Sequence, residues 1–228
     1  NAVKLYDGSA WRTWNSDSLG VPYQNRWGAS FDGSSANRLS VPKEICTPLA
    51  SSTWSISTWI NPVTQSGYDY IFSNGLPVQL VYQGGKIRSW LSHNNSSYFA
   101  ADVTSTASVS TGVWTHLVAV FTTTSLKFYL NGSLDATHTY SSNTCANPDQ
   151  ACAIGNYITS GNYDFDGFID EVAVFDAALS ASDISKIYNS GVPTSLTLAA
   201  SYDTDRTSNL KGYWRMGDDS NDSATSGG

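Results

Sequence analysis

Apolar and polar residues alternate in short runs along most of this chain, which is the periodicity of a β-strand with one buried face. Four residues of the run 54–61 share one phase: Trp54, Ile56, Thr58 and Ile60. These side chains would fill the space between two sheets. The other phase therefore places Trp59 on the outer face of its sheet.

Turn residues separate the runs and indicate how they connect. Residues 114–122 and 125–131 predict a hairpin, and Asn131-Gly132 predicts a tight turn into residues 134–140. A turn at Asp32-Gly33 is expected to form a hairpin from the two strands beside it. Further strands are expected at 29–31, 38–41, 70–73, 77–82, 86–92 and 98–103. Many short strands with a single helix near the end predict an all-β sandwich.

The end of this pattern is a strand that leads into a short helix. Phe168, Val172 and Val174 share one face of a strand in the run 165–176. After it, Ser180 or Ser182 can cap a helix that carries Ile184 and Ile187. A buried strand is thus expected to precede one short helix.

Six segments carry a resemblance to a known family: 29–33, 54–60, 112–120, 126–132, 154–156 and 165–184. They resemble, in the same order, the motifs of laminin-G-like domains, which belong to the concanavalin A-like and pentraxin type of jelly roll. In the last segment the matching residues include Phe165, Gly167, Ile169-Asp170-Glu171-Val172, Phe175 and Leu179-Ser180. The resemblance covers residues 31–188. It implies a two-sheet antiparallel jelly roll with one short C-terminal helix.

The signature occurs once, which favours one domain over residues 1–192. Residues 193–228 are expected to form a linker and a terminal strand. Within them, residues 210–218 resemble the segment that opens a laminin-G-like domain, and the connection before it resembles repeat linkers of marine bacteriophage structural proteins. This segment either begins a following repeat or completes a sheet in the same or a neighbouring subunit.

The charge of the chain argues against nucleic-acid binding. Its formal net charge is −7 and its 12 Lys and Arg residues are scattered singly, whereas a phosphate-backbone site needs clustered cations. Charged residues make up only 14% of the chain, and no apolar run approaches the length of a membrane span. We expect a protein of the extracellular space or of a virion surface that does not insert into membranes.

Three cysteines are present. Cys145 and Cys152 enclose a loop that contains Pro148, and a local disulfide between them is expected; two reduced thiols are the alternative. Cys46 would then be left over, as a buried inert thiol or an intermolecular link.

The residues that glycoside hydrolysis requires are sparse. The chain has two glutamates, Glu44 and Glu171, in separate segments, and no pair of closely spaced glutamates. Asp164 and Asp166 could serve as a catalytic pair, although solvated loop residues are the more ordinary interpretation. His116 is expected to be a hydrogen-bonded structural histidine, because no acid lies in its motif. A hydrolase or lyase is therefore the alternative hypothesis, and a non-enzymatic module is the first.

Calcium is the expected cofactor, as a structural ion held by oxygen ligands. The family resemblance implies Asp170 together with the turn at Asp32 and Gly33 as its ligands. The alternative is that Asp170 only accepts hydrogen bonds from backbone donors.

Glycan binding requires exposed aromatic rings with amide or carboxylate groups beside them. The candidate residues are Trp59, Trp90, Tyr98, Tyr129 and Asn94. Each ring could instead lie in the core or cover a sheet.

The sequence therefore predicts a virion fibre or decoration protein, or an extracellular adhesion protein, that recognises glycans or neighbouring subunits. Oligomers formed by strand exchange through residues 210–216 are a further expectation.

Overall fold

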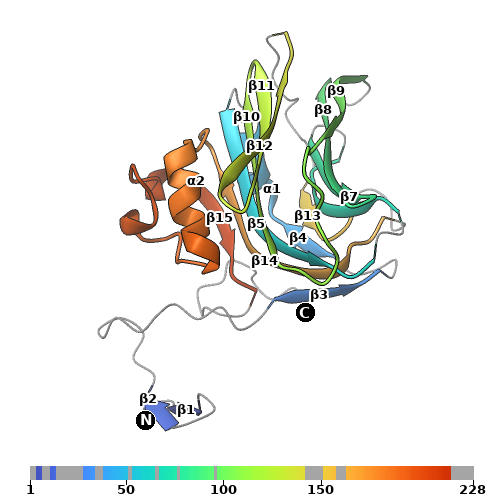
Figure 1. Ribbon diagram of the computed structural model, residues 1–228. Coiled ribbons are helices and arrows are strands. Elements are labelled where there is room, and N and C mark those ends of the chain that lie inside the picture. Colours follow the sequence, from blue (N-terminus) through green and yellow to red (C-terminus); the bar gives the residue numbers. More distant parts are fainter. Residues whose placement is uncertain are drawn as a thin grey trace.

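Two antiparallel sheets pack face to face in the computed structural model of this protein, and helix α2 (Ala181–Tyr188) lies against the outer face of one of them (Figure 1). The structure describes residues 4–6, 11–13, 28–33, 38–50, 53–64, 67–75, 78–94, 97–141, 151–157 and 163–216. The two-sheet antiparallel sandwich with one short C-terminal helix is the predicted fold. No helix among these residues has the length and hydrophobicity that crossing a membrane requires.

The first sheet has seven strands. Their order is β12 (Ser133–Thr139), β11 (Ser125–Leu130), β10 (Thr115–Thr122), β5 (Thr53–Pro62), β14 (Asp166–Phe175) and β15 (Leu210–Trp214), with β3 (Ala29–Asp32) also paired to β14. The predicted hairpin of β10 and β11 is confirmed, as is the tight turn at Asn131-Gly132, where both residues have positive φ.

The second sheet has six strands. Their order is β4 (Leu39–Val41), β13 (Cys152–Ile154), β6 (Asp69–Ser73), β7 (Val78–Gln83), β8 (Lys86–Asn94) and β9 (Ser97–Thr104). Strands β1 (Lys4–Tyr6) and β2 (Trp11–Thr13) pair only with each other among the described strands. The short helices are α1 (Lys43–Cys46), η1 (Thr47–Ala50), η2 (Asn189–Gly191), η3 (Ala199–Ser201) and η4 (Thr207–Asn209).

The main hydrophobic core fills the space between the sheets. Trp54, Ile56 and Ile60 of β5 lie in it, and the Trp54 ring stacks on Phe121 with 5.1 Å between ring centroids. Trp59 lies on the opposite face of the same strand, where its ring contacts Tyr188. The assignment of the two faces of β5 from sequence is confirmed.

A second hydrophobic cluster covers the outer face of the seven-stranded sheet. It joins Val118, Tyr129 and Phe175 of the strands to Ile184 and Ile187 of α2, and it includes Leu196 and Tyr202. Ser180 is the N-cap of α2 and forms a capping box with Asp183, which confirms the first of the two predicted caps. The helix therefore holds the segment after it against the sheet.

A β-bulge in β14 makes one prediction wrong. Val172 and Val174 face the core as expected, but Phe168 is exposed, and Ile169 takes the inner position instead. The pairing with β5 shifts between Asp170 and Ala173, and Glu171 has a φ of 51°. One extra residue at the bulge inverts the alternation, so the two halves of the strand have opposite phases.

The hairpin expected around Asp32-Gly33 is also wrong. Strand β3 pairs with β14 in the seven-stranded sheet, whereas β4 pairs with β13 in the six-stranded sheet. The chain therefore changes sheets at this turn, and the two strands do not pair with each other. A turn signal in the sequence specifies a change of direction but not the partner of the next strand.

Strand β15 pairs antiparallel with β14 of the same chain. Within this single chain, residues 210–214 thus complete the seven-stranded sheet. Trp214 reaches the main core, and Tyr213 reaches the cluster under α2. Strands β3 and β15 together occupy the edge of β14 that β5 leaves open.

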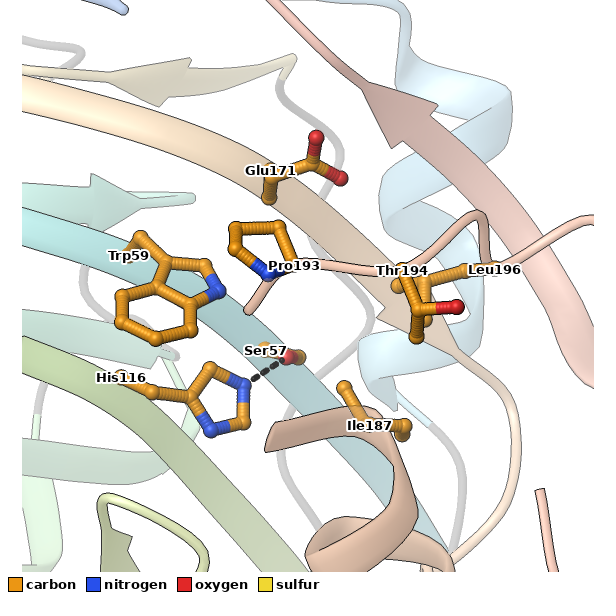
Figure 2. A pocket seen from close by; sticks show the side chains of 8 residues that line it. All are labelled: Ser57, Trp59, His116, Glu171, Ile187, Pro193, Thr194 and Leu196. Carbon is orange, nitrogen blue, oxygen red and sulfur yellow. Dashed lines mark hydrogen bonds between the residues drawn. The ribbon is translucent and has the colours of Figure 1, made fainter. Parts of the chain in front are cut away.

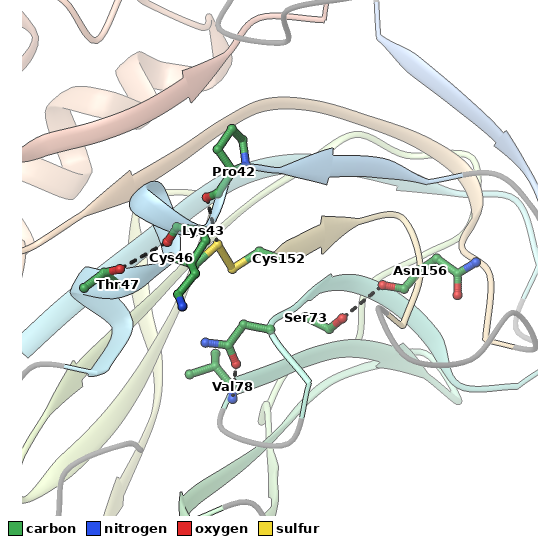
Figure 3. The surroundings of a disulfide bond; sticks show 9 residues. Pro42, Lys43, Cys46, Thr47, Ser73, Val78, Cys152 and Asn156 are labelled. Carbon is green, nitrogen blue, oxygen red and sulfur yellow. Dashed lines mark hydrogen bonds between the residues drawn. A yellow bond between two sulfur atoms is a disulfide. The ribbon is translucent and has the colours of Figure 1, made fainter. Parts of the chain in front are cut away.

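The disulfide differs from the expected one. It joins Cys46 at the end of α1 to Cys152 at the start of β13, with 6.1 Å between the Cα atoms (Figure 3). The prediction that Cys152 pairs with Cys145 is wrong, and Cys145 lies outside the described residues. Both bonded cysteines are fully buried. Strand β13 pairs with β4 immediately before α1, which brings together two cysteines that are 106 residues apart in sequence.

Candidate functional site: an aromatic platform with adjacent carboxylates

The outer face of the six-stranded sheet carries aromatic side chains at β6 to β8. Leu80 and Leu91 face the core, so their neighbours Gln79 and Trp90, which are paired across β7 and β8, face outward. Tyr70 of β6 shares this face, because its hydroxyl donates a hydrogen bond to Gln79 Oε1 at 2.8 Å. Trp90 therefore lies on the same face of the sheet as Tyr70 and Gln79, and it is partly exposed whereas these two residues are buried.

Two loops extend this surface with further tyrosines. We call Tyr68, Tyr70, Trp90, Tyr157 and Tyr163 the aromatic platform. The Tyr68 ring lies 5.7 Å from Trp90 and 6.2 Å from Tyr163, and Tyr70 lies 5.6 Å from Tyr163 and 5.0 Å from Tyr157, between ring centroids. A backbone hydrogen bond from Tyr70 N to Tyr163 O ties the two segments together.

Part of the platform is open to solvent. Tyr68 is 44% exposed and Tyr163 is 40% exposed, whereas Tyr70 is buried beneath them. The Tyr68 and Tyr163 rings are perpendicular, with an interplanar angle of 90°. Two exposed rings at this angle present two flat apolar faces, which is the kind of surface on which sugar C–H groups stack.

Four aspartates lie beside the platform, and we call Asp32, Asp69, Asp164 and Asp166 the carboxylate cluster. Asp69 lies between two platform tyrosines in sequence, and Asp164 follows Tyr163. The charge of Asp166 acts on Asp69, and the charge of Asp32 acts on Asp164. Asp166 also lies against the turn at Gly33, where an added Cβ would be 3.3 Å from the Asp166 Cβ. The cluster thus joins β3, β6 and the start of β14.

Burial shifts the acidities of the cluster. Asp69 is 4% exposed, and its Oδ2 accepts no hydrogen bond in the structure. This burial, with the nearby charge of Asp166, raises the pKa of Asp69 to about 7. Burial also raises the pKa of Asp164, although the Asn156 amide donates a hydrogen bond to its Oδ1 and opposes the rise. Carboxylates here can accept hydrogen bonds from the hydroxyl groups of a sugar, and they repel other anions.

The residues predicted for glycan binding lie at different places in the fold, and only one of them belongs to the platform. Trp90 belongs to the platform. Trp59 and Tyr129 are buried on the outer face of the other sheet, under Tyr188 and the cluster beneath α2, so neither ring is available to stack on a sugar. The side chains of Tyr98 and Asn94 lie outside the described residues, although their backbones belong to β9 and β8.

The expected calcium ligands do not come together. Asp32 is paired with Asp166, four positions along β14 from Asp170, which corresponds to about 13 Å at ~3.3 Å per residue. Asp170 is buried, and its Oδ1 accepts a hydrogen bond from Glu171 N at 2.7 Å. Among the residues that the structure describes, no group of three or more His, Cys, Asp or Glu side chains could hold a metal ion. Asp32, Gly33 and Asp170 therefore do not form one ligand set here.

His116 lies in a covered pocket of about 10 Å³ between the seven-stranded sheet and the segment after α2 (Figure 2). A hydrogen bond of 2.9 Å joins its Nε2 to Ser57 Oγ, and burial lowers the pKa of the imidazole to about 3. Glu171 also lines the pocket, and it accepts a hydrogen bond from the Tyr213 hydroxyl. His116 is fully buried, in keeping with a structural histidine. A pocket close to the size of one water leaves no room for a sugar.

The sequence interpretation missed Tyr68, Tyr157 and Tyr163. A signal was present, because the pair Tyr-Asp occurs twice: Tyr68-Asp69 lies at the start of β6, and Tyr163-Asp164 lies just before β14. Tyrosine supplies a flat ring with a polar end, and aspartate supplies a hydrogen-bond acceptor. Only the fold shows that these two segments are neighbours.

The two-sheet sandwich seen in the structure agrees with the protein family that the sequence matches. Residues 31–185 match the family model of laminin G type that is described as the concanavalin A-like lectin/glucanases superfamily. The chain belongs to this superfamily. No curated protein sequence matches this member of the superfamily.

Solved structures of similar fold include lectin-like and toxin proteins. A Bacteroides ovatus protein to which carbohydrate binding is attributed has a TM-score of 0.60 at 15% identity, over 82% of this chain and 50% of its own. A heptameric SAP-like pentraxin of Limulus polyphemus has a TM-score of 0.52 at 18% identity, over 70% of this chain and 80% of its own.

Botulinum neurotoxin type C, whose cell entry depends on two ganglioside molecules, has a TM-score of 0.51 at 16% identity, over 67% of this chain and 39% of its own. The chain thus spans half the length of the Bacteroides protein and less of the toxin. At these identities the likeness concerns the fold alone. The superfamily member described here shares an architecture with carbohydrate-binding proteins, and its ligand has to be argued from its own surface.

Proposed function

We propose that this domain is a non-catalytic glycan-binding module and that the aromatic platform is its sugar-binding surface. The observation that carries the proposal is the exposure of the perpendicular Tyr68 and Tyr163 rings beside Trp90 and next to carboxylates. Apolar faces with a few polar acceptors at their edge are what a sugar ring needs, because its C–H face is apolar and its rim carries hydroxyls.

The rigidity of the platform supports this proposal. Tyr70 is held beneath Tyr163 by its hydrogen bond to Gln79 and by the backbone bond to Tyr163. Asn156, next to Tyr157, holds Asp164 through its amide. A surface that is ordered before the ligand arrives loses less conformational entropy on binding.

We propose an extracellular or virion-surface setting, in a fibre or decoration protein or in an adhesion protein, with glycans of a cell surface as partners. The disulfide between Cys46 and Cys152 supports a compartment outside the reducing cytoplasm. The low content of charged residues, 14%, is typical of such β proteins.

The direct test is binding of the purified domain to a glycan array and to immobilised polysaccharides. Tyr68→Ala and Tyr163→Ala should each weaken binding by roughly tenfold, since losing one stacked ring costs about 1.4 kcal/mol. Trp114→Ala is the matched control, because Trp114 is 41% exposed and packs on Phe168 of the other sheet. Its binding should equal that of the unmodified domain.

Two outcomes contradict the proposal. One is that no glycan or polysaccharide is bound by the unmodified domain. The other is that Trp114→Ala removes binding while the platform substitutions leave it intact. Circular dichroism of each variant establishes that a loss of binding is not a loss of fold.

A polysaccharide hydrolase or lyase is the second candidate, and one observation favours it. Asp69 and Asp166 lie near each other, and the pKa of Asp69 is raised to about 7, as that of a general acid often is. The burial of Asp69 opposes this function, because a general acid must contact the oxygen of the leaving group. Release of reducing ends that disappears in Asp164→Asn or Asp166→Asn would favour the enzyme over the binding module.

A further inference from the structure

We propose that Asp164 and Asp166 are specificity-determining residues, which make the aromatic platform select uncharged glycans and reject those that carry carboxylate or sulfate groups. This inference rests on the proposed function. It goes further in naming the chemical class of the ligand and the residues that exclude the other class.

The two aspartates lie next to the segments that carry the exposed platform rings. Asp164 directly follows Tyr163, one of the two exposed rings, and its Oδ1 accepts from the amide of Asn156, which precedes the platform residue Tyr157. Asp166 is the first residue of β14 and lies close enough to Asp69, the residue between Tyr68 and Tyr70, to raise its pKa. The negative charges therefore lie beside both segments that carry the exposed rings.

The charges of the cluster are not dispersed over the molecule. Asp32 acts on Asp164, and Asp166 acts on Asp69, so the four carboxyl groups interact as two pairs. Asp32 and Asp166, one from each pair, are partners across β3 and β14. Burial is the main cause of the raised pKa of Asp69 and of Asp164, but the charge of a neighbouring carboxylate, Asp166 or Asp32, also contributes to each rise, so negative charges at these sites repel one another. Another anion brought to the same place meets the same opposition.

Two cations of β8, Arg88 and Lys86, face the same side of the sheet as Trp90, and their charges oppose those of the cluster. Lys86 lies four residues before Trp90, and its Nζ donates a hydrogen bond to Thr106 O. Arg88 lies two residues before Trp90 on β8, in the row of Val81 and Tyr70, and its Nε is buried. These two cations offset part of the charge of the four carboxyl groups. The balance stays negative at pH 8, where Asp32, Asp164 and Asp166 add to an Asp69 that has largely ionised.

The expected ratio of affinities for uncharged and acidic glycans follows from screened Coulomb interactions near the protein surface. Two or three unit charges within a Debye length of a bound anion weaken its binding by about tenfold at low salt. The same interactions fade at 1 M salt, where the Debye length is about 3 Å. Uncharged ligands should show little of this salt dependence.

The experiment uses pairs of related glycans, one uncharged and one carrying carboxylates, at pH 8 and low salt. One pair is homogalacturonan in its methyl-esterified form and as the free acid, and another is a set of galactose-terminated glycans with and without sialic acid. The uncharged member should bind about tenfold more tightly than its acidic partner, and this ratio should fall towards one at 1 M NaCl.

Asp164→Asn and Asp166→Asn should each reduce the ratio to about threefold by strengthening binding of the acidic member. Binding of the uncharged member should change less than that of the acidic member, because asparagine keeps one oxygen that can accept from a sugar hydroxyl. Circular dichroism of each variant checks that the platform is still folded. Asp203→Asn is the control, since it removes an equal charge from an exposed position beside Lys186 and α2. It should leave the ratio unchanged.

The results separate this inference from the proposed function. Equal or tighter binding of the acidic member, lost in Tyr68→Ala, overturns the inference and leaves a glycan-binding platform. A ratio that Asp164→Asn and Asp166→Asn do not alter also overturns it. Absence of Tyr68-dependent binding to either member of every pair contradicts the proposed function itself.

Discussion

The ionised carboxylate of Asp69 is unfavourable in the folded state because it is buried. It is 4% exposed, its Oδ2 accepts no hydrogen bond, and the charge of Asp166 is near. Its pKa is raised to about 7 from the ordinary value of 3.8. The folded protein therefore binds a proton at Asp69 between about pH 4 and pH 7 that the unfolded chain does not bind. The stability due to this proton is fully present below pH 4 and is lost as the pH rises through 7.

We therefore predict that Asp69→Asn stabilises the protein at pH 8, by about 2 kcal/mol, and has little effect at pH 4. The asparagine is uncharged at both pH values, so it removes the cost of a buried carboxylate only where the aspartate is ionised. Urea unfolding at pH 4, 6 and 8 measures the difference between the two proteins. His116, whose low pKa lowers stability in acid, is present in both and cancels. An equal difference at all three pH values would contradict the prediction.

At the scale of elements, β15 stands out because it follows the helix that closes the family signature. Its side chains complete two hydrophobic clusters, with Trp214 in the core between the sheets and Tyr213 under α2. It also supplies backbone partners for the second half of β14. A strand that fills both a core and a sheet edge is part of the folding unit.

Trp214→Ala should therefore destabilise the domain by about 4 kcal/mol, the cost of removing a large buried ring. Lys211→Ala on the same strand is the control: its ion pair with Asp176 spans 2.8 Å but is partly exposed, so the loss should stay below about 1 kcal/mol. Urea unfolding of both variants compares the two losses. A Trp214→Ala protein as stable as the unmodified one would show that β15 does not belong to this domain in solution.

At the scale of the molecule, the disulfide ties α1 to the second strand of the six-stranded sheet. Its cysteines are 106 residues apart, so it closes a loop that contains most strands of both sheets. Closing a loop of this length restricts the unfolded chain strongly, which stabilises the folded state relative to it.

Reduction of the disulfide should lower the free energy of unfolding by about 4 kcal/mol. Cys145→Ser should leave both the stability and its sensitivity to reductant unchanged, because Cys152 is bonded to Cys46. Unfolding with and without a phosphine reductant tests this for both proteins. If Cys145→Ser removed the sensitivity to reductant, the pairing of Cys46 with Cys152 would be incorrect.

The amino-acid sequence by itself determined most of the strands, the presence of one helix capped by Ser180 or Ser182, and which family the chain belongs to. The alternation in residues 54–61 and a serine cap at 180 or 182 depend on near neighbours in the chain, so they can be predicted without a structure, which then shows Ser180 as the cap. The tertiary structure decided the bulge at Glu171, the partner of Cys152 and the covering of Trp59 by Tyr188. It also brought Tyr68 next to Tyr163. These features join residues that are distant in sequence or depend on a local shift of register, and alternation within one segment carries no information about either.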